Sequence, residues 1–113
     1  MAGDAGTGYA EAIWDLVRSV PPGRVTTYGD IAEAYYGVRK GARGIGQAIA
    51  RCPDDVPWWR VVGAGGVIVE RPHAREQRAR MLEEGVVFDT TGRVDFERSG
   101  GVFSPPTSHR SAT

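Results

Sequence analysis

The sequence has little of what a disulfide, a metal site or a membrane span requires. Its 113 residues contain one cysteine, Cys52, so no intrachain disulfide is possible. Together with two histidines, a single thiol argues against a structural zinc site of the usual kind. No stretch approaches the roughly 20 apolar residues that span a bilayer, and no basic segment precedes apolar residues as in a signal peptide. We therefore expect a cytoplasmic protein with no membrane association, no metal and no cofactor.

Motifs that bind nucleotides or cleave bonds are also missing. The chain has no GxxxxGK[ST], no strand–GxGxxG–helix unit and no HExxH. A Ser/His/Asp triad would have to recruit His73, which lies beside Pro72 at a predicted helix start, and no nucleophile elbow accompanies it. The chain is therefore poorly supplied for an enzyme with its own base and nucleophile.

The charges cancel, with fourteen basic and fourteen acidic residues. A neutral total argues against binding nucleic acid by bulk attraction but allows a local patch. Such a patch lies between residues 39 and 51, where no acid occurs among Arg39, Lys40, Arg43 and Arg51. Thirteen of the fourteen basic residues are Arg. This excess reflects either a GC-rich coding sequence or bidentate contacts to phosphates and bases, which Lys does not make.

The length predicts one domain. We expect a loose arm over residues 1–8, a folded body over 9–98 and a disordered Gly/Ser/Pro-rich tail over 99–113. Apolar spacing predicts helices over about 10–20, 42–51 and 73–84. Thr27 followed by Asp30 predicts a further helix start, and Gly37 ends that helix.

Strand signals are short. Residues 61–62 and 67–69 around GAGG predict a hairpin or wing, and residues 86–88 and 94–96 form either two short strands or a final extended segment. The two middle helices and their Gly-containing turn suggest a helix-turn-helix, although an αα-hairpin has the same spacing. The predicted fold is mainly α with a small β hairpin, in a winged-helix-like layout.

The segment VPWWRVV at 56–62 stands out. Neighbouring side chains in extended chain point to opposite sides, so we expect Trp58 or Trp59 to line a cleft or face solvent rather than both to be core. An aromatic wall beside Arg60 suits a nucleobase, because the ring packs on the base and the cation holds a phosphate or an oxygen.

These pieces together resemble the C-terminal, DNA-binding domain of O6-alkylguanine-DNA alkyltransferases. The matching segments are PPGRVTTYGDIA at 21–32, GARGIGQAIARCP at 41–53, VPWWRVVGAGGVI at 56–68 and MLEEGV at 81–86. They occur in family order and spacing over about two-thirds of the chain. The resemblance implies a winged-helix-like DNA-binding domain of the alkyltransferase C-terminal type.

One departure decides the implied function. The family's active site reads Pro-Cys-His-Arg, and the same positions here are Pro57, Trp58, Trp59 and Arg60. Indole cannot accept an alkyl group as a thiolate does. Alkyltransferase-like proteins replace that Cys, typically by Trp, and pass O6-alkylguanine lesions to nucleotide excision repair without repairing them. The resemblance implies such a protein, acting near the nucleoid as a monomer on double-stranded DNA.

The family's residue roles carry over onto matching positions. Tyr28 matches the Tyr that helps turn the nucleotide out, and Arg43 matches the Arg that fills the space left by the flipped base. The helix over 42–51 matches the recognition helix, which lies in the minor groove. Arg60 and Glu84 match structural residues of the motif, and Cys52 falls where the family has an Asn.

Two sets of site residues follow. The implied lesion pocket comprises Trp58, Trp59, Tyr28 and Arg71. The implied DNA-binding set comprises Tyr28, Arg39, Lys40, Arg43, Gly44, Gln47 and Arg51, and Pro57 joins Arg60 and Glu84 as structural. The residues themselves also favour a DNA-binding helix here. Gly44 and Gly46 have no side chains, so the helix backbone can approach a narrow groove.

Other interpretations stay open from the residues. Tyr28 also suits a core aromatic, Arg43 a solvated surface residue and Cys52 a small buried apolar one. The orientation of Trp59, toward pocket or core, is left open. Two other functions compete with a lesion sensor: a relocated alkyltransferase that uses Cys52, and a winged-helix regulator without lesion specificity. The regulator would read the major groove, but glycines deplete the face that would carry base-reading side chains.

Overall fold

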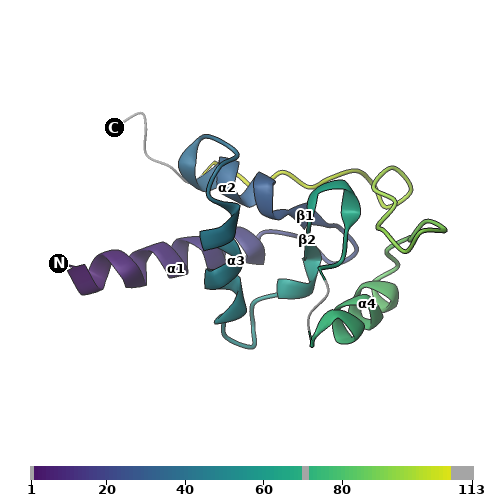
Figure 1. The fold of residues 1–113 in the computed structure, drawn as a ribbon, viewed down its shortest axis with the longest axis horizontal. Coiled ribbons are helices and arrows are strands. Elements are labelled where there is room, and N and C mark those ends of the chain that lie inside the picture. Colours follow the sequence, from purple (N-terminus) through teal and green to yellow (C-terminus); the bar gives the residue numbers. More distant parts are fainter. Residues whose placement is uncertain (1, 70–71, 108–113) are drawn as a thin grey trace.

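The computed structural model describes residues 2–69 and 72–107. Figure 1 shows three helices gathered on one side of a small sheet and a fourth helix on the other. The helices are α1 (Ala2–Arg18), α2 (Tyr28–Tyr36), α3 (Ala42–Ala50) and α4 (Ala74–Glu83). The strands are β1 (Thr26–Thr27) and β2 (Val61–Val62). The fold is mainly helical with a small sheet, as predicted. None of the helices in the described part is long and apolar enough to cross a membrane.

Helix α1 begins earlier than the sequence suggests. It starts at Ala2, so the described part of the predicted loose arm over 1–8 is helical. No proline interrupts the chain before Pro21, so no residue in this segment is barred from a helix. The expected apolar face forms, because Ile13 and Val17 are fully buried. The buried residues of α1 whose burial is described begin at Ala10, so this face packs where the sequence predicted it.

The α2–α3 pair forms as predicted. The Thr27 hydroxyl caps α2 by accepting the backbone N–H of Asp30 at 3.0 Å. Gly37 ends the helix in the left-handed region, with φ of 86°, which a residue with a Cβ rarely adopts. Ile31 of α2 and Ile45 of α3 are fully buried in one core with Ile13.

Helix α1 lies across α3 rather than along it (Figure 1), and the two helices are in contact. The indole Nε1 of Trp14 donates to the carbonyl of Ala48 at 2.8 Å. One turn further, Arg18 pairs with Asp55 just beyond α3, with Nε and Oδ2 3.0 Å apart. These contacts fix the orientation of α3 from the side opposite its exposed face.

The predicted hairpin over 61–62 and 67–69 is wrong. Strand β2 instead pairs in parallel with β1, with Thr26 opposite Val61 and Thr27 opposite Val62. Gly66 ends a short 3₁₀ turn over residues 64–66, and its carbonyl accepts the N–H of Val94 at 2.8 Å. A Cβ at Gly66 would collide with the Val94 backbone, so this close approach needs glycine. Within the loop the N–H of Gly63 donates to the carbonyl of Val67 at 2.8 Å, but residues 67–69 form no strand.

The predicted disordered tail over 99–113 is also wrong for its described part. Val102 bridges Val25 in parallel, and the N–H of Phe103 donates to the Val25 carbonyl at 2.7 Å. Ser99 is buried, and its hydroxyl accepts the N–H of Val87 at 2.9 Å. Val25 immediately precedes β1, so this segment completes an edge that would otherwise leave polar backbone groups unpaired. The folded body therefore extends past residue 98, and residues 108–113 lie outside the described part.

Candidate nucleic-acid interface

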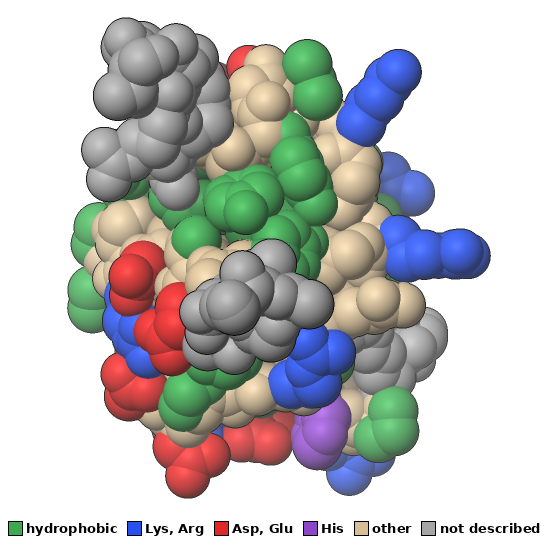
Figure 2. Space-filling model, turned by 90° about the vertical axis from the view of Figure 1, so that its left-hand side faces the viewer, with side chains coloured by type: hydrophobic (Ala, Val, Ile, Leu, Met, Phe, Trp, Pro, Cys, Tyr) green, Lys and Arg blue, Asp and Glu red, His purple; other side chains and the backbone are tan. Residues whose placement is uncertain are grey.

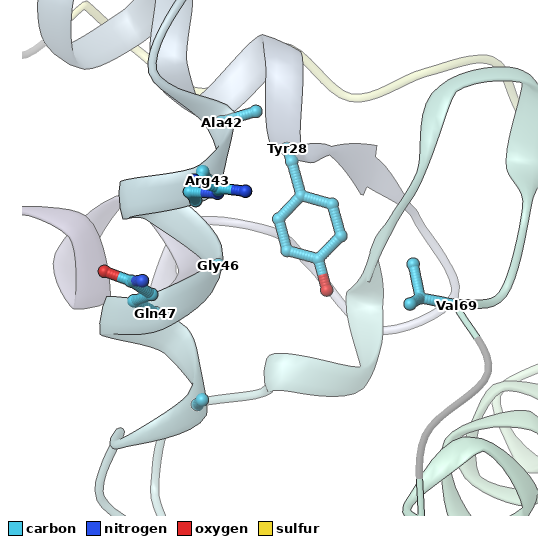
Figure 3. Close-up of a pocket in the computed structure, with 7 residues that line it drawn as sticks. Tyr28, Ala42, Arg43, Gly46, Gln47 and Val69 are labelled. Atoms are coloured by element: carbon cyan, nitrogen blue, oxygen red, sulfur yellow. The ribbon is translucent and has the colours of Figure 1, made fainter.

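The exposed face of α3 borders a groove. Arg43 and Gln47 lie four residues apart on that face, both exposed. The groove has a volume of about 460 Å³, and Tyr28 forms its opposite wall. Figure 3 shows the Tyr28 ring projecting from the start of α2 into the space between α3 and Val69. Tyr28 is therefore a half-buried residue at the site rather than a plain core aromatic.

Small residues line the α3 side of this groove. Ala42, Gly46 and Ala50 contribute no side chain larger than a methyl group. A helix with side chains is about 10–12 Å across, while the minor groove of DNA is only about 6 Å wide. A helix face without bulk is therefore suited to close approach to a duplex.

The predicted basic patch is exposed, but its four cations differ in whether they form ion pairs within the protein. Lys40, Arg43 and Arg51 form no ion pair with the residues that the structure describes. Arg39 instead pairs with Asp30 at 2.8 Å and Glu33 at 3.0 Å, which ties the turn after α2 back to the first half of that helix. Figure 2 shows Lys and Arg side chains along one edge of the molecule, apart from a cluster of Asp and Glu. The structure thus leaves three of the four predicted cations available.

A larger cavity adjoins the groove. Its volume is about 720 Å³, and it lies between the end of α3, a 3₁₀ turn over Trp58–Arg60 and the start of α4. Tyr28, Ala50 and Val69 line both the groove and the cavity. Protein sites for small organic groups are typically about 300–1,000 Å³, and this cavity lies within that range.

Both tryptophans line this cavity. The half-buried Trp58 ring lies edge-on to Trp59 and is tilted by 61° against the His73 ring, with centroid distances of 6.0 Å to each. We predicted that neighbouring side chains here would point to opposite sides because the chain was expected to be extended. The 3₁₀ turn changes that premise and brings both indoles to one hollow. Pro57 precedes the turn and is buried.

Trp59 also belongs to a buried polar network. Its Nε1 donates to Glu84 Oε2 at 3.1 Å, and Arg60 pairs with the same carboxylate at 2.6 Å. Arg60 further donates to the carbonyl of Val20 at 2.8 Å, and Glu84 accepts the N–H of Gly23 at 3.2 Å. Glu84 therefore ties the aromatic turn to the loop after α1.

The charge of Glu84 is stabilised by this network. Burial by itself would raise the pKa of Glu84, but hydrogen bonds from Arg60, Gly23 and Trp59 hold the pKa below its usual value. The carboxylate is consequently ionised, and it accepts hydrogen bonds from Arg60, Gly23 and Trp59. Its hydrogen bond to Nε1 fixes the direction of the Trp59 ring.

Two further residues of the site went unpredicted. Gln77 is buried on α4, and its Nε2 donates to the carbonyls of Trp59 at 3.2 Å and Val61 at 2.8 Å. The Arg80 guanidinium lies 4.6 Å from the Trp59 ring centroid. A polar Gln four residues before the buried Met81 was the available signal for Gln77.

Cys52 lines the same cavity as a free, half-buried thiol. Burial raises its pKa, and the nearby negative charges of Asp55 and Asp54 raise it further. The thiol therefore stays protonated at neutral pH, which makes it a poor nucleophile.

Two other predicted site residues are not among the described residues that line the cavity. Predicted Gly44 lies on the side of α3 that faces Tyr9. Predicted Arg71 lies outside the described residues.

A helix-turn-helix unit with a small-residue face, a cationic rim and an adjoining aromatic cavity defines a DNA-binding domain of the alkyltransferase type. Residues 8–86 match the family described as 6-O-methylguanine DNA methyltransferase, DNA binding domain. The chain belongs to this family, as the sequence resemblance predicted.

Relatives and solved structures refine this assignment. The chain is 37% identical to the DNA base-flipping protein of Escherichia coli over 80% of this chain and 71% of that protein. It is 43% identical to Alkyltransferase-like protein 1 of Schizosaccharomyces pombe over 75% of this chain and 82% of the relative.

The fold matches the crystal structure of S. pombe Atl1 in complex with damaged DNA containing O6-carboxymethylguanine. The TM-score is 0.71 at 30% identity, covering 88% of this chain and 97% of that one. The Mycobacterium tuberculosis OGT in complex with DNA matches with a TM-score of 0.61 at 29% identity, over 67% of this chain and 48% of that one.

Proposed function

We propose that this protein is a non-enzymatic sensor of O6-alkylguanine in double-stranded DNA. In this account α3 enters the minor groove, the damaged nucleotide turns out of the stack and its base enters the cavity beside Trp58. The observation that carries the proposal is the cavity itself, about 720 Å³ in volume, lined by two indoles and joined to the α3 groove through Tyr28. The names of the relatives, a base-flipping protein and an alkyltransferase-like protein, support it.

Energetics favour a damaged base over an intact one. Extruding a base costs a few kcal/mol, and less when the base pairs poorly, as an alkylated guanine does. Contact with an aromatic ring returns about 1–3 kcal/mol per base. In this proposal Trp58, which lines the cavity, makes that contact, and Arg43, which lines the groove, occupies the vacated stack. The net free energy of turning the base out and packing it on Trp58 is therefore most favourable where the base pair is already weak.

Alkyl transfer to the protein is not expected. An indole stands at the position where the family carries its alkyl-accepting Cys, and carbon and N–H cannot act as a thiolate. The one thiol, Cys52, has a raised pKa. Glu84, the residue that orients a histidine in the family motif, instead holds Trp59. The protein would therefore retain the lesion rather than repair it, and we infer that it passes the lesion to nucleotide excision repair as a monomer.

The test is a binding titration on matched duplexes that carry guanine or O6-methylguanine at one position, followed by intact-protein mass spectrometry. We expect tighter binding to the damaged duplex and an unchanged protein mass. A mass gain of one methyl group would refute the non-enzymatic role. Equal affinity for the two duplexes would instead favour a DNA-binding regulator without lesion specificity.

A further inference from the structure

Two tyrosine hydroxyls meet beside α3, outside the groove and the cavity already described. Tyr9 comes from α1 and Tyr36 from the last turn of α2, and their hydroxyl oxygens lie 3.3 Å apart. The Tyr9 ring packs edge-on against Tyr35, with centroids 5.2 Å apart, which fixes its direction. Tyr36 is 43% exposed, so the pair is open to a ligand.

The pair lies along the flank of α3 that faces away from Tyr28. The Tyr9 hydroxyl would be 3.0 Å from a Cβ at Gly44, and the Tyr36 ring would be 2.7 Å from one at Gly41, which precedes the helix. Gly46, by contrast, lines the groove shared with Tyr28. Positions 44 and 46 are about 200° apart on a helix, so they lie on opposite sides. The exposed ridge of α3 therefore runs between Tyr28 and the Tyr9–Tyr36 pair.

The chemistry of the pair suits an anion. Burial and the hydrogen bond with Tyr36 raise the pKa of Tyr9, so its hydroxyl stays protonated and can donate. Arg51, beyond the end of α3, is close enough for its charge to act on Tyr9. Neutral hydroxyl donors beside cations are a common means of holding a DNA phosphate.

We propose that the Tyr9–Tyr36 hydroxyl pair binds a backbone phosphate of the strand opposite the lesion. This inference rests on the proposed function, because it takes α3 to lie in the minor groove. A helix in a groove has one strand on each flank. The Tyr28 flank opens into the cavity and so receives the damaged strand. The other flank, which carries the tyrosine pair, consequently faces the complementary strand.

The first test compares wild type with the Tyr9→Phe/Tyr36→Phe double variant on plain and O6-methylguanine duplexes. Removing both hydroxyls should weaken binding about three- to tenfold on each duplex, leaving the ratio between duplexes unchanged. The slope of log affinity against log salt should stay the same, since no charge is removed. Tyr35→Phe, a hydroxyl deletion in the same cluster, is the matched control and should bind within twofold of wild type. Tyr36→Phe alone should give a smaller loss in the same direction.

The second test assigns the strand. Single uncharged methylphosphonates are placed along either strand, and wild type is compared with the double variant at each site. At the contacted phosphate of the complementary strand, wild type should lose affinity and the double variant should lose much less. The proposal would be overturned if the double variant bound the unmodified duplexes as tightly as wild type. It would also be overturned if the two proteins differed in their response only at methylphosphonates of the damaged strand. Equal wild-type affinity for the two duplexes would refute lesion sensing instead, while the loss on plain DNA would still decide the role of the pair.

Discussion

Replacing Trp58 by Ala should reduce discrimination between damaged and intact DNA. The half-buried indole forms the wall of the cavity at which the extruded base would pack. Losing an aromatic contact to a base costs about 1–3 kcal/mol, or about 5- to 150-fold in affinity. Because intact DNA gains nothing from the cavity, the loss should fall on the O6-methylguanine duplex alone. Fluorescence anisotropy with both duplexes at one salt concentration measures it.

Controls separate binding from folding in this experiment. Trp58 also packs against the core shared by α1, α2 and α3, so denaturant unfolding should show a stability loss, about 1–3 kcal/mol for a half-buried ring. Trp58→Phe keeps a ring and should lose less discrimination. Trp14→Phe alters a tryptophan on α1 away from the cavity; any effect of its lost hydrogen bond on α3 should fall equally on both duplexes and leave discrimination intact. Equal losses on both duplexes for Trp58→Ala would refute the reasoning.

Three further predictions address other parts of the account. Arg43→Ala should weaken binding to the O6-methylguanine duplex more than to plain DNA, as measured by the same titration; an equal loss would make Arg43 a simple phosphate contact. Glu84→Gln should lower the free energy of unfolding by about 2–3 kcal/mol at neutral pH, because Arg60 loses its partially buried partner. Since the pKa of Glu84 is lowered by folding, wild type should lose this advantage as pH falls below about 4.5, whereas equal acid sensitivity of both proteins would contradict the network. Trp58→Cys should show no methyl transfer by mass spectrometry, because Trp59 supplies no base; efficient transfer would contradict that role for Trp59.

Features encoded by neighbouring residues were predictable from the sequence. The bounds of α2 follow from the Thr27 cap and Gly37, and α3 follows from the spacing of its buried isoleucines and alanine. The resemblance marked Glu84 as a structural residue of the motif, but its hydrogen bond to Trp59 was not predicted.

Features that depend on distant partners were missed. The pairing of β2 with β1 joins residues 35 positions apart, and Val102 meets Val25 across most of the chain. Apolar alternation cannot choose between such partners and a local hairpin. The engagement of Arg39 with Asp30 and Glu33 was likewise invisible in a count of charges, because it depends on how the chain turns after α2.

In the proposed function an extruded purine is seated against Trp58. Fluorine NMR of protein labelled with 5-fluorotryptophan tests it directly, since the chain has three tryptophans and single Phe variants assign each signal. Saturation with the O6-methylguanine duplex should shift the Trp58 resonance strongly and leave that of Trp14 nearly in place, while plain duplex moves neither. A Trp58 resonance that stays unmoved at full occupancy of the damaged duplex would contradict the account.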